Sequence, residues 1–515
     1  MRVAGAIAVL GSVVALGIVP ASGATGAPTP VNQASTSSRG VSTNAIRVVF
    51  PIISFTSIEG EFEIESDAEY GEQVKAIHLF VNQINDAGGI HGRKIIPMIV
   101  SFDPTNADEE RSLCKQWTEG SPPVFAVLDG LGTWEGDNEL CITQEGHTPM
   151  LSQWTTTTNW TDLGSPYLWW TGADDAPILA ATVSWGLSSG RLGHGQKVGV
   201  VVSDQASDQS ALTSYLLPDL KKIGVDPQVE TISADLGETA STDSDATLAV
   251  ERLKESGIQS VIPLLPENAF TPYISAETAQ KYFPKLLLSD YQSEIEVALG
   301  LIPIPYDKAL NGQEGVTAET LGGIDLPRPE SEGGYDPGVR SCWDLWHKTY
   351  PQIPKGNIND DIEEQGPVQG WCQEIRLFAQ AATMAGRNLN RRTFVEAMSR
   401  ITNFPGGYSP VLSYGPHKFY GPTEYRVVEV HDNHPPTTLC KRGPGPPAGV
   451  CWVVEQNWKP LPSTVGILPP GGPDAWLLAT VSAKPEDVEP VAVRFEPFRR
   501  GETVNGGGHV SFECR

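Results

Sequence analysis

The sequence has few basic residues for its length. Its 515 residues include 36 Lys and Arg against 62 Asp and Glu, which gives a formal net charge of −26 at pH 7. Contacts with the phosphates of a nucleic acid need a basic face, so we expect no nucleic-acid partner. The negative surface of a membrane would repel the chain for the same reason.

Long apolar runs are also missing after the N-terminus. The first residues combine the cation Arg2, an apolar run and the small-x-small sequence Ser22-Gly23-Ala24. This pattern predicts that residues 1–24 are a secretory signal peptide, with an uncleaved membrane anchor as the alternative. Residues 25–44 are rich in Ser, Thr and Pro and are expected to form a flexible lead. We therefore expect a secreted or extracytoplasmic protein with no membrane span after signal cleavage.

Cysteine is scarce, with seven in the chain. In an oxidising compartment they can form disulfides, although the sequence alone does not determine which cysteines pair. Cys514 is the odd one out in the arrangement that we expect. The candidate pairs are Cys114 with Cys141, Cys342 with Cys372, and Cys440 with Cys451.

Apolar strand-like segments alternate with amphipathic helical segments through most of the chain. Residues 46–53, IRVVFPII, form a near-continuous apolar run, as expected for a strand buried on both faces. Such alternation predicts an α/β fold with parallel sheets and helices on both of their faces. Two such runs, separated near residues 167–177, predict two Rossmann-like lobes. Three apolar segments within 460–515 predict a β-rich C-terminal extension.

The segment FVNQINDAGGIHGRKI, residues 80–95, places three glycines after a predicted helix and before a predicted strand. An anion cradle needs the opposite order, with a strand, a glycine loop and then a helix N-terminus. Glycine at a helix C-terminus adopts positive φ and reverses the chain. We therefore interpret the segment as a turn, with Arg93 and Lys94 as cations near the negative end of the helix dipole.

Ligands of open α/β sheets bind beyond the carboxyl ends of the strands. Gly132, Thr133 and Trp134 lie between such a strand and the start of a helix, where free N–H groups suit a carboxylate or another acceptor. The segment GLGTWEG has one residue too many for a dinucleotide fingerprint, and no acidic residue closes the next strand. We expect no nicotinamide cofactor here and no other cofactor.

The order of these elements resembles a known family. The helix end INDAGGIHGRKI, the strand and Asp103 after it, TPMLS, KVGVVVSD and ATLAVERLKESGIQSVIPL follow one another as in the leucine-binding-protein-like family of type I periplasmic solute-binding proteins. The late segment GPHKFYGPTEYRVVEV resembles the closing segment of that family, so the resemblance covers roughly residues 44–432. It implies two lobes that close on a small ligand for delivery to an ABC importer.

The resemblance also implies that both lobes are discontinuous in sequence. Lobe 1 would comprise residues 45–170 and 316–403. Lobe 2 would comprise residues 171–315 and a closing segment, 404–459. The β-rich extension, 460–515, would follow.

By resemblance, residues after the fourth strand contact ligand through backbone groups and a Thr hydroxyl; here they are Ser152, Trp154, Thr155 and Thr156. The alternative is that this Thr run is a polar loop. The second lobe would contribute Asn268, Asp290 and Tyr291. In amino-acid binders of the family an acid near the last place pairs with the ligand ammonium, and Asp290 is its possible counterpart, or else a solvated acid or a helix N-cap.

Other motifs carry weaker predictions. Six acids alternate over residues 59–69 and form either a solvated face or a site for a cation: Glu59, Glu61, Glu63, Glu65, Asp67 and Glu69. Ser188 lies in a G-x-S-x-G match, but it follows a helix, whereas the hydrolase elbow needs a strand before the serine. His431 and His434 lack further ligands at a telling distance, so we predict no metal site and no catalytic residues.

The resulting hypothesis is a monomeric extracellular solute-binding protein, not an enzyme. It would capture a small polar ligand, such as an amino acid or an amide, and would dock on the membrane permease of an ABC importer. A ligand-sensing receptor module is the alternative, and a secreted hydrolase is a weaker one. Relatives are commonly tethered by a lipid on a Cys at the cleavage site, whereas the first Cys here is Cys114. Retention would then depend on a periplasm-like space, an uncut signal or a partner.

Overall fold

The computed structural model describes residues 39–53, 66–103, 106–130, 137–153, 158–193, 195–234, 239–295, 298, 306–319, 337–351, 362–407, 409–432 and 450–462. The chain divides into two units, Met1–Pro462 and Ser463–Arg515, and the described residues all belong to the first. Most of the predicted C-terminal extension and the predicted signal peptide lie outside them. No helix among the described residues is long and apolar enough to cross a bilayer.

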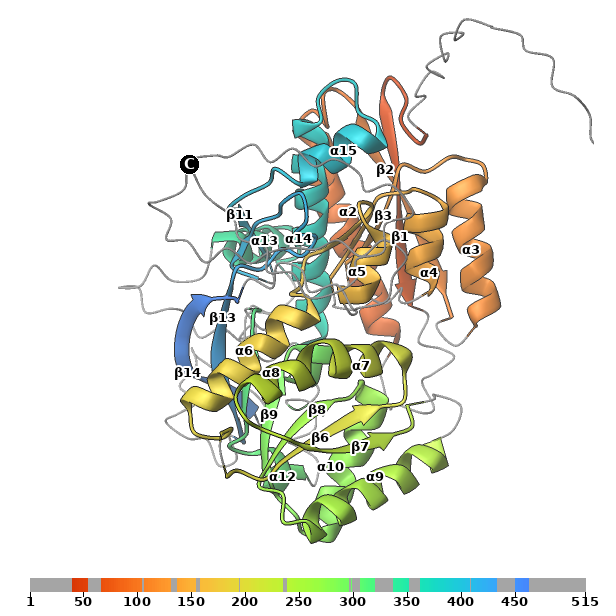
Figure 1. Cartoon of the computed structure of the whole chain (residues 1–515). Coiled ribbons are helices and arrows are strands. Elements are labelled where there is room, and N and C mark those ends of the chain that lie inside the picture. Colours follow the sequence, from red (N-terminus) through yellow and green to blue (C-terminus); the bar gives the residue numbers. More distant parts are fainter. Residues whose placement is uncertain are drawn as a thin grey trace, which may run out of the picture. The chain divides into compact units, whose positions relative to one another are not determined.

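The first sheet is built from the strands that the sequence predicts, and one more. Its strand order is β2-β1-β3-β4-β5 and every neighbouring pair is parallel. The strands are β1 (Ala45–Ile53), β2 (Lys94–Phe102), β3 (Ala126–Asp129), β4 (Met150–Ser152) and β5 (Leu168–Trp170). They are joined by α2 (Ser66–Asp86), α3 (Ala107–Glu119), α4 (Asp137–Leu140), which continues as a π-helical turn over Cys141–Glu145, and α5 (Thr158–Gly164) (Figure 1).

Both faces of this sheet are buried, which explains the apolar run in β1. Ile46, Val48 and Phe50 belong to one buried cluster, together with side chains of α2 and of the late helix α14 (Ile362–Met384). Val49 points to the other face, where it joins a cluster that includes Trp117 of α3. Two further late helices, α13 (Pro337–Thr349) and α15 (Arg391–Met398), contact α14. A sheet covered on both faces needs apolar residues at successive positions.

The second sheet has the order β14-β13-β10-β9-β8-β6-β7. Its parallel strands are β6 (Val198–Ser203), β7 (Gln228–Ile232), β8 (Ser260–Leu264), β9 (Lys285–Ser289) and β10 (Glu314–Thr317). The helices of this region are α6 (Asp175–Ser188), α7 (Ala206–Ala211) with a π-helical turn (Leu212–Leu216), α8 (Leu217–Lys222), α9 (Thr239–Glu255), α10 (Glu267–Gln280), a 3-10 turn η4 (Tyr291–Ser293) and α12 (Asp307–Leu310).

The prediction of parallel sheets needs one correction in this second sheet. β13 (Glu424–Asp432) pairs antiparallel with β10, and β14 (Val450–Pro460) pairs antiparallel with β13. Between β10 and β13 the chain passes through α13, α14, α15 and a short hairpin of β11 (Phe404–Pro405) and β12 (Val411–Leu412). The α/β fold of two sheets with parallel strands is otherwise as predicted.

The glycine-rich segment after α2 is a turn, as predicted. Gly88 and Gly89 have φ of 106° and 68°, in the region that favours glycine. A Cβ on Gly89 would stand 2.1 Å from the carbonyl oxygen of Arg93. Arg93 donates through Nε to the carbonyl of Ser42 and through Nη2 to that of Arg387. Its guanidinium therefore holds backbone segments together.

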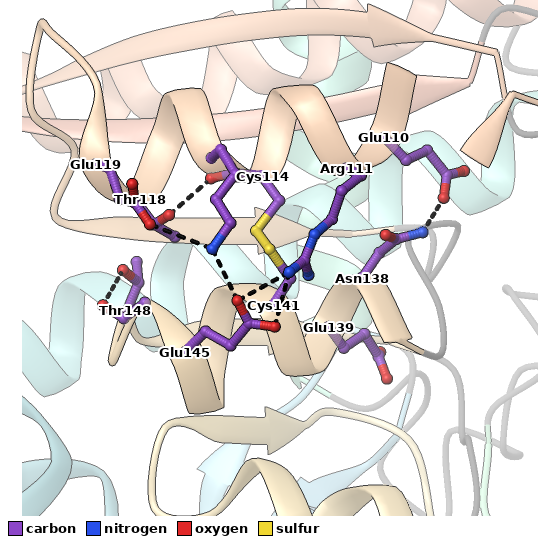
Figure 2. Close-up of a disulfide and its surroundings, with 12 residues drawn as sticks. Glu110, Arg111, Cys114, Thr118, Glu119, Asn138, Glu139, Cys141, Glu145 and Thr148 are labelled. Carbon is purple, nitrogen blue, oxygen red and sulfur yellow. Dashed lines mark hydrogen bonds and ion pairs between the residues drawn. A yellow bond between two sulfur atoms is a disulfide. The ribbon is translucent and has the colours of Figure 1, made fainter. Parts of the chain in front are cut away.

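Two of the three expected cysteine pairs are disulfides. Cys114–Cys141 joins α3 to the helical turn after α4, and Cys342–Cys372 joins α13 to α14. Beside the first, Glu145 accepts hydrogen bonds from both Arg111 and Lys115 at the surface (Figure 2). Cys440 and Cys514 lie outside the described residues, as does the side chain of Cys451.

Candidate functional site

In the first sheet, the carboxyl ends of β3 and β4 lie side by side. Asp129 and Ser152, the last residues of the two strands, are register partners. Both are buried, and Ser152 Oγ donates to Asp129 Oδ2 over 3.4 Å. The predicted contacts after these strands lie outside the described residues: Gly132, Thr133, Trp134, Trp154, Thr155 and Thr156. Of the predicted first-lobe contacts, Ser152 lies within the described residues.

Helix α14 packs directly under these strand ends. A Cβ on Gly130 would meet the Trp371 ring at 2.5 Å, and one on Gly370 would meet the carbonyl oxygen of Gly130 at 2.0 Å. Two glycines in contact allow the helix and the strand end to approach each other without side chains between them. Glu374, one turn beyond Gly370, is fully buried with no hydrogen bond to either carboxylate oxygen. Burial first, and then the charge of Asp129, raises the pKa of Glu374 well above its usual range.

In the second sheet, the ends of β6 and β9 are joined by a buried hydrogen-bond network around Asp208. The hydroxyl of Tyr291 donates to Asp208 Oδ1 over 2.5 Å, and the Gln292 amide donates to the same oxygen over 3.1 Å. Ser203 Oγ donates to Asp208 Oδ2. Asp208 is fully buried, and burial raises its pKa against the opposing effect of these donors. The network holds Tyr291 and Gln292 in place after β9.

Asp290 lies at the same edge and is not a solvated acid. It is 8% exposed, and its Oδ2 accepts a 2.6 Å hydrogen bond from the amide of Ala318, which follows β10. Its side chain makes no capping hydrogen bond to the η4 turn, so the N-cap alternative is wrong. Burial raises the pKa of Asp290 to about 7, although a hydrogen bond from the Thr317 side chain, the Ala318 amide and the nearby Arg426 lower it. Oδ1 of Asp290 accepts no hydrogen bond.

A second acid, Glu294, is buried beside this edge. It is fully buried, and its Oε1 accepts from the amide of Leu265, which follows β8, over 3.3 Å. Its Oε2 has no hydrogen-bond partner. Burial raises the pKa of Glu294 well above its usual range. Hydrogen bonds from the backbone of Leu265 and Ser289 lower it, and the charges of Asp208 and Asp290 raise it further. Three carboxyl groups therefore influence one another at the carboxyl ends of β6, β8 and β9.

Asn268 and Arg426 complete the edge through structural contacts. Asn268 Nδ2 donates to the carbonyl of Ala234 over 2.7 Å, which ties the start of α10 to the segment after β7. Arg426 is buried, lies 4.8 Å from the Trp458 ring centroid and donates to the carbonyl of Glu319. In this structure both side chains hold the loops of the sheet edge together.

Asp208, Glu294 and Asp129 are not among the site residues predicted from the sequence. Asp129 could have been found, because it is the last residue of a predicted strand. Asp208 follows a predicted strand end by five residues, at the start of a helix, where an acid is usually explained by the helix dipole. Glu294 offers no local signal, because only the fold brings it under β8.

The weaker motifs have the following places. Ser188 is the last residue of α6, and its hydroxyl donates to the Trp185 carbonyl within that helix, so it is not on a strand-to-helix turn. Nε2 of His431 lies 2.6 Å from Oε1 of Glu429, and His434 is outside the described residues. The acidic run of residues 59–69 is likewise outside them, apart from the helical backbone of its last residues. Among the described residues no three His, Cys, Asp or Glu side chains form a group able to hold a metal ion.

With this geometry in place, the chain can be compared with known proteins. Residues 66–301, from α2 to beyond β9, match the family model described as periplasmic binding protein. The resemblance inferred from the sequence is confirmed over this segment. No curated protein matches the sequence.

Solved structures share the fold over most of the chain. The fatty acid ABC transporter substrate-binding protein from Thermomonospora curvata is 17% identical, with a TM-score of 0.57 over 82% of this chain and 94% of that one. A solute-binding protein of an ABC transporter from R. palustris, in complex with 4-hydroxybenzoate, is 14% identical, with a TM-score of 0.57 over 81% and 98%. A leucine-binding protein from Thermotoga maritima is 13% identical, with a TM-score of 0.54 over 75% and 96%. At these identities the likeness establishes the type I periplasmic binding protein fold.

Proposed function

We propose that this chain is an extracytoplasmic solute-binding protein that captures one small molecule and delivers it to the permease of an ABC importer. The observation that supports this proposal is the family match over residues 66–301, a segment that includes the carboxyl ends of β6, β8 and β9. Parallel α/β sheets bind ligands at that edge. The ligands named for these neighbours include a fatty acid, 4-hydroxybenzoate and leucine, so the fold does not select the solute.

The proposal assigns binding to the strand-end residues. Ser152 and the loops around it would contact the solute from the first sheet, and Asp290 and Tyr291 from the second. Asp208 would act as a positioning residue, because it holds the Tyr291 hydroxyl and the Gln292 amide. No bond of the solute would be broken, since Ser188, the one nucleophile that a sequence motif suggested, is engaged inside α6. The protein would act outside the cytoplasm, as a monomer.

Native mass spectrometry of residues 25–515 mixed with a metabolite pool tests this proposal. The expected result is one small molecule retained per chain, with its mass unchanged after release. Tyr291→Phe removes the hydrogen bond to Asp208 and should weaken retention, while Tyr282→Phe, which alters a tyrosine bonded to the Ile258 carbonyl at the start of β8, should not. Release of a chemically altered molecule would favour an enzyme, and no retained molecule from any pool would overturn the proposal.

A further inference from the structure

Among the described elements, the chain changes from one sheet to the other after β5, after β10 and between β12 and β13. β12 lies with the first sheet, because Leu412 belongs to the buried cluster of that sheet. The first and third of these crossings run side by side. The amide of Trp170, the last residue of β5, donates to the carbonyl of Phe419 over 2.7 Å, and the hydroxyl of Tyr414 donates to the carbonyl of Trp170 over 2.9 Å. A change in the relative placement of the two sheets therefore has to bend both crossings together.

Lys418, in the third crossing, places its ammonium group among four backbone carbonyls. Its Nζ donates to the carbonyls of Ser413 and Tyr420 over 2.6 Å and 2.7 Å. The carbonyl oxygens of Gly421 and Pro422 both lie 3.1 Å from the same nitrogen, and the ring centroid of Tyr420 lies 4.0 Å from it. An ammonium has three N–H donors and a full positive charge, so it can serve these four acceptors together. A neutral amine has two donors and no charge, so it cannot.

These four carbonyls belong to the two ends of one loop. That of Ser413 follows β12 directly, and the other three come from residues 420–422, just before β13. Backbone pairing of Leu412 with Pro422 closes the loop at its base. Carbonyl oxygens that converge on one point repel one another, so the two ends of the loop depend on the cation between them. Lys418 thus fixes the direction in which the chain enters β13.

The first crossing is close both to Lys418 and to the candidate site. Burial lowers the pKa of Lys418 to about 7, and the opposing charge is that of Asp174, the N-cap residue of α6. The next residue, Asp175, acts on the strand-end network: burial, the charge of Asp208 and then that of Asp175 raise the pKa of Tyr291 well above its usual range. The start of α6 therefore lies within electrostatic reach of the Lys418 ammonium and of the Tyr291 hydroxyl.

We propose that Lys418 is a positioning residue for solute binding: its ammonium fixes the third crossing, and with it the relative placement of the two strand-end edges, without contacting the solute. The inference rests on the proposed function, in which the solute contacts both edges. A solute held from two sides binds the arrangement in which both edges are in place. Its apparent dissociation constant therefore rises as the population of that arrangement falls, and loss of the ammonium lowers that population.

Isothermal titration from pH 6 to pH 9, with the molecule that the wild type retains from the metabolite pool, tests the inference. Lys418→Met keeps the length of the side chain but removes its charge and its donors, and it should bind that molecule at least tenfold more weakly at pH 6. The difference from the wild type should shrink as pH rises through about 7, because the wild type then loses the same ammonium. Lys222→Met, at an exposed lysine of α8, should bind like the wild type at every pH. Thermal unfolding checks that each variant is folded.

The outcomes separate the two proposals. Binding by Lys418→Met as tight as that of the wild type at pH 6, or a loss of affinity that is the same at every pH, overturns the role of the ammonium and leaves the solute-binding proposal intact. If Lys418→Met does not fold, Lys418→Arg decides, because its charge does not titrate in this range. Its affinity should fall less between pH 6 and pH 9 than that of the wild type, and an equal fall overturns the inference. Failure of every metabolite pool to give a bound molecule overturns the solute-binding proposal itself.

Discussion

At the scale of single residues, the most informative groups are carboxyls buried without a cation beside them. An ionised carboxylate loses its hydration when it is buried, and an opposite charge or several donors must replace that hydration. Glu374 has neither. Both of its carboxylate oxygens lack hydrogen bonds, and the charge that influences its pKa is the like charge of Asp129. Burial therefore favours the protonated, uncharged form of Glu374 in the folded state over the unfolded one.

Glu374→Gln should change how stability depends on pH. The unfolded pKa of Glu is about 4.3, and the folded pKa is well above it. The folded state binds the extra proton between these values, so this contribution is fully present below about pH 4.3 and is lost as pH rises toward the folded pKa, by up to about 1.4 kcal/mol per pH unit. Gln is neutral at every pH, so the variant should lose less stability from pH 5 to pH 8.

Urea denaturation of both proteins at pH 5, 6, 7 and 8 measures the effect. Glu294 and the other raised acids contribute equally to both curves, so the difference between them isolates Glu374. Glu255→Gln, an exposed glutamate in α9, should give a curve parallel to the wild type. Parallel curves for Glu374→Gln would show instead that this carboxyl has the same protonation in both states.

At the scale of elements, helix α14 determines how the end of β3 is held. Gly370 is inside the helix, where Ala is favoured over Gly by about 1 kcal/mol in an open environment. Here a Cβ would stand 2.0 Å from the Gly130 carbonyl oxygen and 2.2 Å from Gln153 Oε1. The contact is with backbone on one side, so the strand end itself has to move.

Gly370→Ala should therefore destabilise the protein by about 1–3 kcal/mol, despite its better helix propensity. Chemical denaturation measures this, and Thr383→Ala, at an exposed position of the same helix, should change stability by no more than about 0.5 kcal/mol. A Gly370→Ala variant as stable as the wild type would mean that α14 does not press against β3 as described.

The disulfide between α3 and the turn after α4 is the strongest cross-link in its neighbourhood. It closes a loop with a sequence separation of 27, for which the chain-entropy relation gives about 3–4 kcal/mol. The ion pairs of Glu145 beside it are largely exposed and are screened by water. Replacing both Cys114 and Cys141 with Ala should lower the free energy of unfolding by at least this amount.

Glu145→Gln should have a much smaller effect than loss of the disulfide, and the two can be compared by urea denaturation in one buffer. Equal losses would mean that the surface ion pairs, not the covalent link, fix α3 to α4. Thiol titration of the unfolded wild type under non-reducing conditions verifies that the disulfide is present.

The sequence predicts strands well where they are continuous apolar runs. β1, β2, β6, β8 and β9 are found as expected, because strands buried on both faces give continuous apolar runs. β5 and β10 have three and four residues, too few to show a pattern, and unlike β4 they match no family segment quoted above. β13 and β14 are antiparallel additions at the edge of the sheet, which the alternation of strands and helices does not reveal. Asp290 and Tyr291 could be singled out as strand-end residues, but their burial and the contacts of Asp208 and Glu294 depend on pairings far apart in sequence.

At the scale of the whole molecule, the two edges of the sheets differ in the charge of their connecting segments. The carboxyl ends of the strands in both sheets carry acids, polar loops and almost no basic residues, and the amino ends carry Lys and Arg. A fold built from repeated strand–helix units places all such connections at one edge of each sheet. The proposed site lies at the carboxyl-end edge, where the sequence places few cations.

Hydrogen–deuterium exchange of residues 25–515, with and without the solute identified by native mass spectrometry, tests the position of the site most directly. The account predicts at least tenfold slower exchange in peptides that cover residues 203–208 and 289–294, at the carboxyl ends of β6 and β9. Peptides covering 223–228 and 256–260, at the amino ends of β7 and β8, should exchange at unchanged rates and serve as the internal control. Protection confined to those amino-end peptides, or no change at either edge with solute bound, would contradict a binding site at the carboxyl ends of the strands.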